Sequence, residues 1–208
     1  MHVETLVVGP IEENCYVVSS DISRTAVVID PGADSSYILQ RIAEWKLDIQ
    51  AILVTHGHPD HILALADLSS ALPDAAIYFP PADLAMAFDP AAAIPGLLPV
   101  PRKPSLPLLP VQDGIELPLA DTRWQCLATP GHTPGGVCWF LPEADILFTG
   151  DTLFAGSIGR TDFPGGDMHT LSASLRRLAE LPGSPAVYPG HGPATTLDIE
   201  RKTNPFLR

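Results

Sequence analysis

The 208-residue sequence predicts an α/β fold, and three observations lead to this prediction. Val-rich segments closed by Gly, Ser or Asp-Pro-Gly dominate the first part of the chain, as is typical of β-strands. A segment with apolar residues at helical spacing follows them, and a continuous apolar run comes next. The second half of the chain again places strand-like segments before helical ones. Because the two halves are alike in kind, we expect one domain over residues 1–208.

Three short N-terminal strands are predicted to form an antiparallel meander, over residues 2–9, 14–19 and 25–30. From Ser35 to Trp45 the apolar residues recur near helical spacing, which predicts a helix. The apolar run over residues 49–55 then predicts a strand that ends at a cluster of histidines. Open α/β sheets bind ligands at the carboxyl ends of their strands, so this position is informative.

Beyond the histidines, the sequence predicts a helix over residues 62–72 and a short strand over residues 75–79. Seven prolines then fall between Pro90 and Pro110. Proline lacks the N–H donor that helices and sheets need. We therefore predict an extended surface loop at about residues 88–112, which either covers the active site or forms a subunit contact.

The second half of the chain predicts further strands and two helical stretches. The strands are expected over residues 115–119, 123–131, 137–142, 144–151 and 186–190, and the helical stretches over residues 170–181 and from Thr196 onward. Polar residues stand at the ends of several of these strands. Those strand ends are therefore the places to look for a site in this half.

Charge and cysteine content narrow the classes of function. The formal net charge is -12, and no cluster of Lys and Arg exceeds a pair, which disfavours nucleic-acid binding. No run of eighteen apolar residues occurs and the N-terminus lacks the features of a signal peptide, so we expect no membrane association and a cytoplasmic location. Cys15, Cys126 and Cys138 form no CxxC pair and are expected to be buried free thiols.

The motif THGHPDH, residues 55–61, points to a metal centre. His56, His58, Asp60 and His61 are all metal-ligating residue types, and a short irregular turn would let their side chains converge. A lone histidine is more often a structural residue. Four ligand types within six positions are hard to explain in that way.

Three further ligand types stand at strand ends in the second half. His132 lies in ATPGHTPGG, Asp151 in LFTGD and His191 in VYPGHGP. Together with the first motif they use five of the seven histidines in the chain. Five histidines and two aspartates exceed the roughly four ligands of one tetrahedral ion. We therefore predict two divalent ions with a carboxylate between them.

Taken together, these motifs resemble the metallo-β-lactamase superfamily. THGHPDH, TPGHTPGG, FTGDTLF and YPGHGP occur in the same order and with similar separations, over nearly the whole chain. Within the superfamily, GDTLFAGSIGRTDFPGGD and the ending GHGPATTLDIERKTNPFL are similar to the short hydroxyacylglutathione hydrolase (glyoxalase II)-like proteins of bacteria. The resemblance implies a four-layer αββα sandwich.

The resemblance also implies how the ligands divide between two metal sites. His56, His58 and His132 would hold the first ion, Asp60, His61 and His191 the second, and Asp151 would bridge the two. We expect zinc at these sites, with iron and manganese as alternatives, since N and O ligands alone do not distinguish them.

The activity that the resemblance implies is hydrolysis of a small-molecule thioester, such as the glutathione-linked S-lactoylglutathione, by a metal-bound hydroxide. Asp60, which would orient the hydroxide, and Asp151 are the predicted catalytic residues. Arg160 is the candidate for binding an anionic substrate, because Arg binds carboxylates through two donors. An internal ion pair with Asp162 or Asp167 is the alternative role for Arg160.

Other functions are compatible with the same residues. A persulfide dioxygenase shares the fold and a GRTDF segment, and uses one iron held by residues that correspond to His56, His132 and Asp151. A lactonase or other ester hydrolase would use the same hydroxide. The non-enzymatic alternative is a metal-binding scaffold that keeps the ligands for stability. A β-lactamase, which usually carries a secretion signal, and a ribonuclease, which needs a basic surface, are disfavoured.

Overall fold

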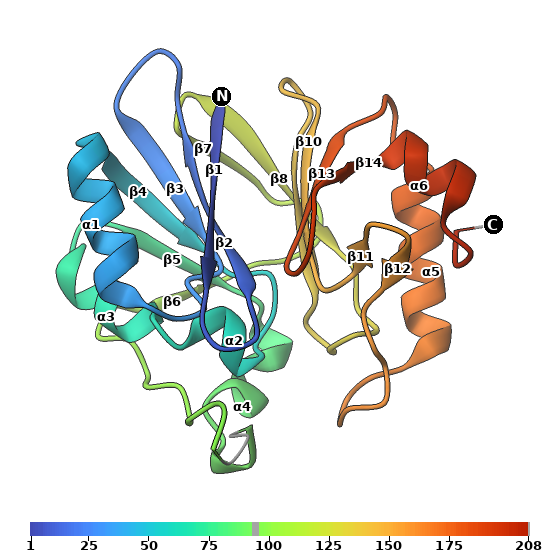
Figure 1. The fold of residues 1–208 in the computed structure, drawn as a ribbon, viewed down its shortest axis with the longest axis horizontal. Coiled ribbons are helices and arrows are strands. Elements are labelled where there is room, and N and C mark those ends of the chain that lie inside the picture. The colour runs from blue at the N-terminus through green and yellow to red at the C-terminus, as the bar shows by residue number, and fades with distance from the viewer. Residues whose placement is uncertain (93–95, 208) are drawn as a thin grey trace.

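The computed structural model describes residues 1–92 and 96–207 (Figure 1). In this part of the chain two six-stranded sheets face each other. Helices α1 and α3 lie on the outer side of the first sheet, and α5 and α6 on the outer side of the second (Figure 1). The predicted α/β class and the four-layer αββα arrangement are therefore confirmed. One domain over residues 1–208 stays a prediction.

The first sheet has the strand order β1-β2-β3-β4-β5-β6. Its strands are β1 (His2–Val8), β2 (Glu13–Ser19), β3 (Thr25–Ile29), β4 (Asp48–Leu53), β5 (Ala76–Phe79) and β6 (Leu108–Pro110). The first three form the predicted antiparallel meander, and β3 to β6 are parallel. Helix α1 (Ser35–Trp45), with the predicted bounds, connects β3 to β4. The carboxyl ends of β3, β4 and β5 consequently meet at one edge.

The helix predicted over residues 62–72 is two short helices, α2 (Pro59–Ile62) and α3 (Leu65–Ala71). Proline is favoured at the first helical position, where its missing N–H leaves no bond unmade, and this starts α2 at Pro59. The chain then turns, because the N–H groups of Leu63 and Ala64 bond to carbonyls of the β3–α1 loop. The prediction of one helix was wrong. The prediction of an irregular turn for the whole histidine motif was also wrong, because its last three residues lie on α2.

The proline-rich segment is partly structured within its described residues. A 3₁₀ helix, η1 (Pro81–Asp83), and the short helix α4 (Leu84–Ala87) precede it, and a second 3₁₀ helix, η2 (Pro90–Ala92), opens it. Strand β6 closes it at the edge of the sheet, where proline is tolerated, so the prediction of a loop up to residue 112 was wrong at its end. Arg102 pairs with Asp67 of α3. Residues 93–95 of the predicted loop lie outside the described residues.

The second sheet has the order β14-β13-β10-β9-β8-β7. Its strands are β7 (Glu116–Leu119), β8 (Thr122–Ala128), β9 (Val137–Leu141), β10 (Ile146–Gly150), β13 (Ala186–Pro189) and β14 (Thr195–Thr196), and a small hairpin of β11 (Leu153–Phe154) and β12 (Ser157–Ile158) follows β10. Helices α5 (Met168–Ala179) and α6 (Leu197–Thr203) are capped at their N-termini by Asp167 and Thr196, whose side chains accept hydrogen bonds from N–H groups of the first turn. Helix α6 ends at Thr203, whereas the final helical stretch was predicted to continue to the end of the chain.

An aromatic core joins the inner faces of the two sheets. Phe148 of β10 is fully buried, and its ring lies 5.3 Å from that of Tyr188 and 5.9 Å from that of Trp124. On the first sheet, the Tyr16 ring is 5.1 Å from Phe148. The three cysteines are buried and free, as predicted. No helix among residues 1–92 and 96–207 is long and apolar enough to cross a membrane.

Candidate metal centre

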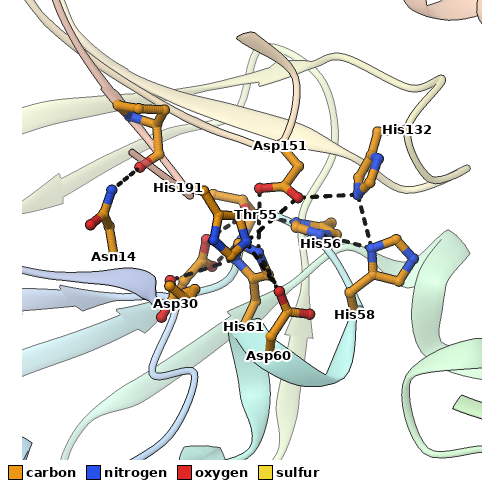
Figure 2. Close-up of polar contacts among 12 residues, drawn as sticks. Asn14, Asp30, Thr55, His56, His58, Asp60, His61, His132, Asp151 and His191 are labelled. Atoms are coloured by element: carbon orange, nitrogen blue, oxygen red, sulfur yellow. Dashed lines mark hydrogen bonds and ion pairs between the residues drawn. The ribbon is translucent and has the colours of Figure 1, made fainter. Parts of the chain in front are cut away.

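The seven predicted ligand residues lie together, on segments that follow strands of both sheets (Figure 2). Those from the first sheet follow β4, and those from the second follow β8, β10 and β13. They are His56, His58, Asp60 and His61 from the first sheet, and His132, Asp151 and His191 from the second. The fold thus brings together residues that are up to 135 positions apart in the chain (191 minus 56).

The first group consists of three histidines whose ring nitrogens converge. His58 Nδ1 lies 3.1 Å from His56 Nε2 and 2.9 Å from His132 Nε2. Asp151 Oδ2 lies 3.5 Å from the same nitrogen of His132. Three nitrogens and a carboxylate oxygen therefore face one small volume, as in a tetrahedral metal site.

The second group consists of Asp60, His61 and His191. Asp60 Oδ2 lies 3.2 Å from His191 Nε2 and 3.5 Å from His61 Nε2. Asp151 Oδ1 lies 3.4 Å from His61 Nε2, while its other oxygen is 3.9 Å from His191 Nε2. Asp151 is therefore placed between the two groups and faces both.

Hydrogen bonds behind two of the histidines determine which ring nitrogen faces the centre. Asp30 Oδ2 lies 3.0 Å from His61 Nδ1 and accepts the Thr55 hydroxyl at 2.6 Å. Since that hydroxyl donates to Asp30, the proton between Thr55 Oγ1 and His56 Nδ1, 3.0 Å apart, belongs to the ring. Both histidines therefore direct Nε2 toward the centre. Burial lowers the pKa of His56 well below its usual value, so its Nε2 is unprotonated, the form that binds a metal.

Burial and neighbouring charges together set the pKa values of the ionisable groups in the centre. Burial, together with His132, lowers the pKa of His58 to about 4, which keeps this ring neutral at pH 7. Burial alone would lower the pKa of His61, but Asp60 and Asp151 outweigh it and raise that pKa well above the usual value. Burial would raise the pKa of Asp151, yet the positive charge of His61 holds it below its usual range. The second group consequently attracts positive charge.

Two buried atoms in this centre fit a cation. Among the described residues, His61 Nε2 and Asp151 Oδ1 have no hydrogen-bond partner, although they lie 3.4 Å apart. Buried polar atoms normally have a hydrogen-bond partner, so two buried ligand atoms that face each other without a hydrogen bond call for a third partner. Imidazole nitrogens and carboxylate oxygens suit first-row divalent ions. The donor set therefore fits a divalent metal.

The Arg160 side chain forms an internal ion pair with Asp162, the role expected for it as the alternative to substrate binding. Its Nε and Nη2 atoms each lie 2.7 Å from an oxygen of Asp162, and the guanidinium lies 3.8 Å from the ring centroid of Phe163. The backbone carbonyl of Arg160 accepts the Nδ1–H of His132 at 2.7 Å. The backbone of Arg160 thus orients a histidine of the first group. Substrate binding by its side chain stays a prediction.

Two buried carboxylates beside the second group were not predicted from the sequence. Asp30 directly follows a strand in VVIDPG, the same kind of position that singled out Asp151, and could have been found. Glu13 gave no such signal. Its Oε1 lies 3.6 Å from His61 Nδ1, and neither oxygen has a hydrogen-bond partner in the described part of the chain. Burial raises the pKa of Glu13 well above the usual value.

Replacing Glu13 with Gln is expected to stabilise the metal-free protein and to weaken its affinity for metal. An unpaired buried carboxylate costs about 1–3 kcal/mol, and because its pKa is raised, this cost is present at pH 7 and vanishes below about pH 4. A nearby cation favours the ionised form of Glu13, which Gln cannot adopt, so we expect about tenfold weaker zinc binding in E13Q. Urea unfolding without metal and chelator competition measure the two effects.

The neighbouring exposed residue supplies the control for this prediction. Glu12→Gln removes the same charge at the surface and is expected to change neither quantity. A less stable metal-free E13Q protein at pH 7 would contradict the expectation.

Comparison with known proteins identifies the family. A model of the metallo-beta-lactamase superfamily matches residues 8–191. Hydroxyacylglutathione hydrolase GloC of Haemophilus influenzae is 36% identical over 217 residues, which cover 100% of this chain and 98% of that protein. The crystal structure of BLEG-1 B3 metallo-beta-lactamase matches with a TM-score of 0.90 and 34% identity, over 99% of both chains.

A second solved structure, of TTHA1623 in a di-iron-bound form, has a TM-score of 0.86 and 42% identity, over 98% of this chain and 100% of that one. The sandwich fold and the histidine–aspartate cluster agree with the match to the superfamily. Since that match spans most of the sequence, the chain belongs to the metallo-beta-lactamase superfamily.

Proposed function

We propose that this chain is a metal-dependent hydrolase of acyl thioesters of the hydroxyacylglutathione kind. The observation that carries the proposal is that two facing buried atoms, His61 Nε2 and Asp151 Oδ1, have no hydrogen-bond partner among the described residues and lie within a cluster of seven potential ligands. The likeness to GloC, whose name states that activity, supports the choice of substrate class.

The proposed ligands divide as the two groups of side chains do. His56, His58 and His132 would hold one ion, Asp60, His61 and His191 the other, and Asp151 both. When bound, divalent ions lower the pKa of a coordinated water to roughly 7 and polarise a substrate carbonyl. Zinc is our first choice of metal, and the di-iron form of TTHA1623 makes iron the alternative to test.

Asp60 is proposed to orient the attacking water. Its Oδ2 atom faces His61 and His191, whereas its Oδ1 atom makes no hydrogen bond or ion pair within the described residues. That free oxygen can accept a hydrogen from a water at the centre, which aims the water's lone pair at the substrate. Asp60 would thus act in positioning the nucleophile as well as in metal binding.

Two aromatic side chains flank the partly exposed histidines of the centre. The Phe163 ring lies 5.9 Å from that of His58, and the Phe154 ring lies 6.3 Å from that of His191. The His191 side chain is 27% exposed, so the centre is open to solvent on this side. We propose that the acyl group of the substrate lies between these rings, with the thiol portion directed to solvent.

The test is a thioester assay on the metal-loaded protein. Protein with two equivalents of zinc or iron is expected to hydrolyse S-lactoylglutathione faster than a simple lactone or a β-lactam at equal concentration. Metal-loaded protein that leaves a panel of glutathione thioesters intact would refute the proposal. Oxygen uptake with glutathione persulfide, without thioester hydrolysis, would instead identify the dioxygenase activity.

A further inference from the structure

Asp83, at the end of η1, is a buried carboxylate next to the first group of histidines. Its side chain has no exposed surface. Oδ2 accepts the Gly57 N–H at 2.9 Å and the Thr133 hydroxyl at 2.7 Å, and Oδ1 accepts the Gly135 N–H at 2.6 Å. Within residues 1–92 and 96–207, none of its hydrogen bonds goes to a histidine. Asp83 therefore acts on the centre through the backbone of its loops.

The three donors belong to two different loops. Gly57 separates His56 from His58 in the loop after β4 of the first sheet. Thr133 follows His132 directly, and lies in the loop after β8 of the second sheet. One carboxylate thus joins the two loops that carry the whole first group of histidines.

The two glycines allow this carboxylate to approach so closely. A Cβ atom at position 57 would lie 2.8 Å from the Cβ of Asp83, and one at position 135 would lie 2.7 Å from its Cγ. Real Cβ atoms do not come so near another heavy atom. Glycine at both positions is therefore required by the contact with Asp83, in addition to any role in turns.

The bonds to Asp83 are strong enough to hold the loops. A carboxylate buried without donors would be very costly, and bonds to an ionised acceptor are about twice as strong as neutral ones. A further tie between the loops is the bond from the Val137 N–H to the Thr55 carbonyl, 2.9 Å long. Asp83 adds three hydrogen bonds, one to the loop after β4 and two to the loop after β8, and so links both loops to η1.

We propose that Asp83 is a positioning residue that sets the separation of His56, His58 and His132 and so the metal affinity of the first group. The inference rests on the metal ligation given under the proposed function. In the second group, Asp60 and His61 lie on α2 and His61 Nδ1 is 3.0 Å from Asp30, and no hydrogen bond joins this group to Asp83 among the described residues. Loss of Asp83 should accordingly weaken one site and spare the other.

The experiment measures cobalt(II) affinity by titration and chelator competition in protein with one group disabled. His191→Asn leaves the first group to be measured, and His58→Asn leaves the second. Asp83→Asn keeps the size of the side chain but replaces an acceptor with a donor. We expect D83N to weaken binding about 10- to 100-fold in the H191N protein and to leave the H58N protein unchanged.

Equal weakening in both backgrounds, together with lower stability of the metal-free protein, would mean a merely structural role and would overturn the inference. If D83N leaves the cobalt affinity of the H191N protein unchanged, and the wild type binds two equivalents of cobalt, the inference is overturned while the proposed function stands. Wild-type protein that takes up no cobalt would refute both. If D83N does not fold, Thr133→Val provides the test instead, because it removes only the hydroxyl that donates to Asp83. Weaker binding in H191N/T133V supports the inference, and unchanged binding overturns it.

Discussion

Replacing Asp151 with Asn is expected to abolish thioester hydrolysis and to lower the metal content of the purified protein. Asp151 faces both groups, with Oδ1 3.4 Å from His61 and Oδ2 3.5 Å from His132. Asn keeps one carbonyl oxygen and no charge, so the first site would lose its only anionic ligand and the second would keep Asp60 alone. Replacing a residue that only supports a metal ligand typically lowers metal affinity or activity 10- to 100-fold. Asp151 is itself a proposed ligand, so we expect kcat/KM to fall by more than about 100-fold.

Elemental analysis and steady-state kinetics measure the two parts of this result. Asp74→Asn removes a carboxylate from an exposed turn and serves as the control, with unchanged metal content and activity. D151N protein that retains two metal equivalents and activity within tenfold of the wild type would show that Asp151 is not the shared ligand.

Replacing Phe148 with Ala is expected to lower the free energy of unfolding by about 3–5 kcal/mol. The ring is fully buried between the sheets, against Tyr16, Trp124 and Tyr188, so the neighbouring aromatic rings cannot close the cavity by small shifts. Strand β10 carries Phe148 three residues before Asp151, and the cavity is expected to loosen the centre as well. Guanidinium unfolding of the metal-free protein measures the change.

The graded replacement and the surface control make this test specific. Phe148→Leu keeps part of the volume and should cost less than the alanine variant. Phe206→Ala removes a ring that is 49% exposed and is expected to stay within about 0.5 kcal/mol of the wild type. A loss below 1 kcal/mol in F148A would mean that the two sheets do not depend on this ring.

The candidate ligands could be predicted because their signals are local. His56, His58, Asp60 and His61 fall within one short motif, and Asp151 directly follows a buried strand. The bounds of α1 and the meander of β1 to β3 also follow from spacing within short windows. In each case neighbouring residues alone decide the conformation, so the pattern can be read along the chain.

Some local patterns were misleading because distant contacts override them. The apolar residues after His61 are spaced like one helix, yet bonds from Leu63 and Ala64 to the β3–α1 loop divide it. The proline-rich segment reads as a loop up to its end, but its last residues pair with β5 as an edge strand. Both outcomes depend on partners that are near in space and far in sequence.

The residues that support the proposed ligands could not be predicted from the sequence for the same reason. Nothing in FPPADLAM distinguishes Asp83 from a surface aspartate, and nothing in IEENC marks Glu13 as buried. The sequence by itself determined which side chains can form a metal centre and at which strand ends they stand. Only the tertiary structure decided which carboxylates orient them and that Arg160 pairs with Asp162, because burial and long-range hydrogen bonds exist only once the two sheets have packed.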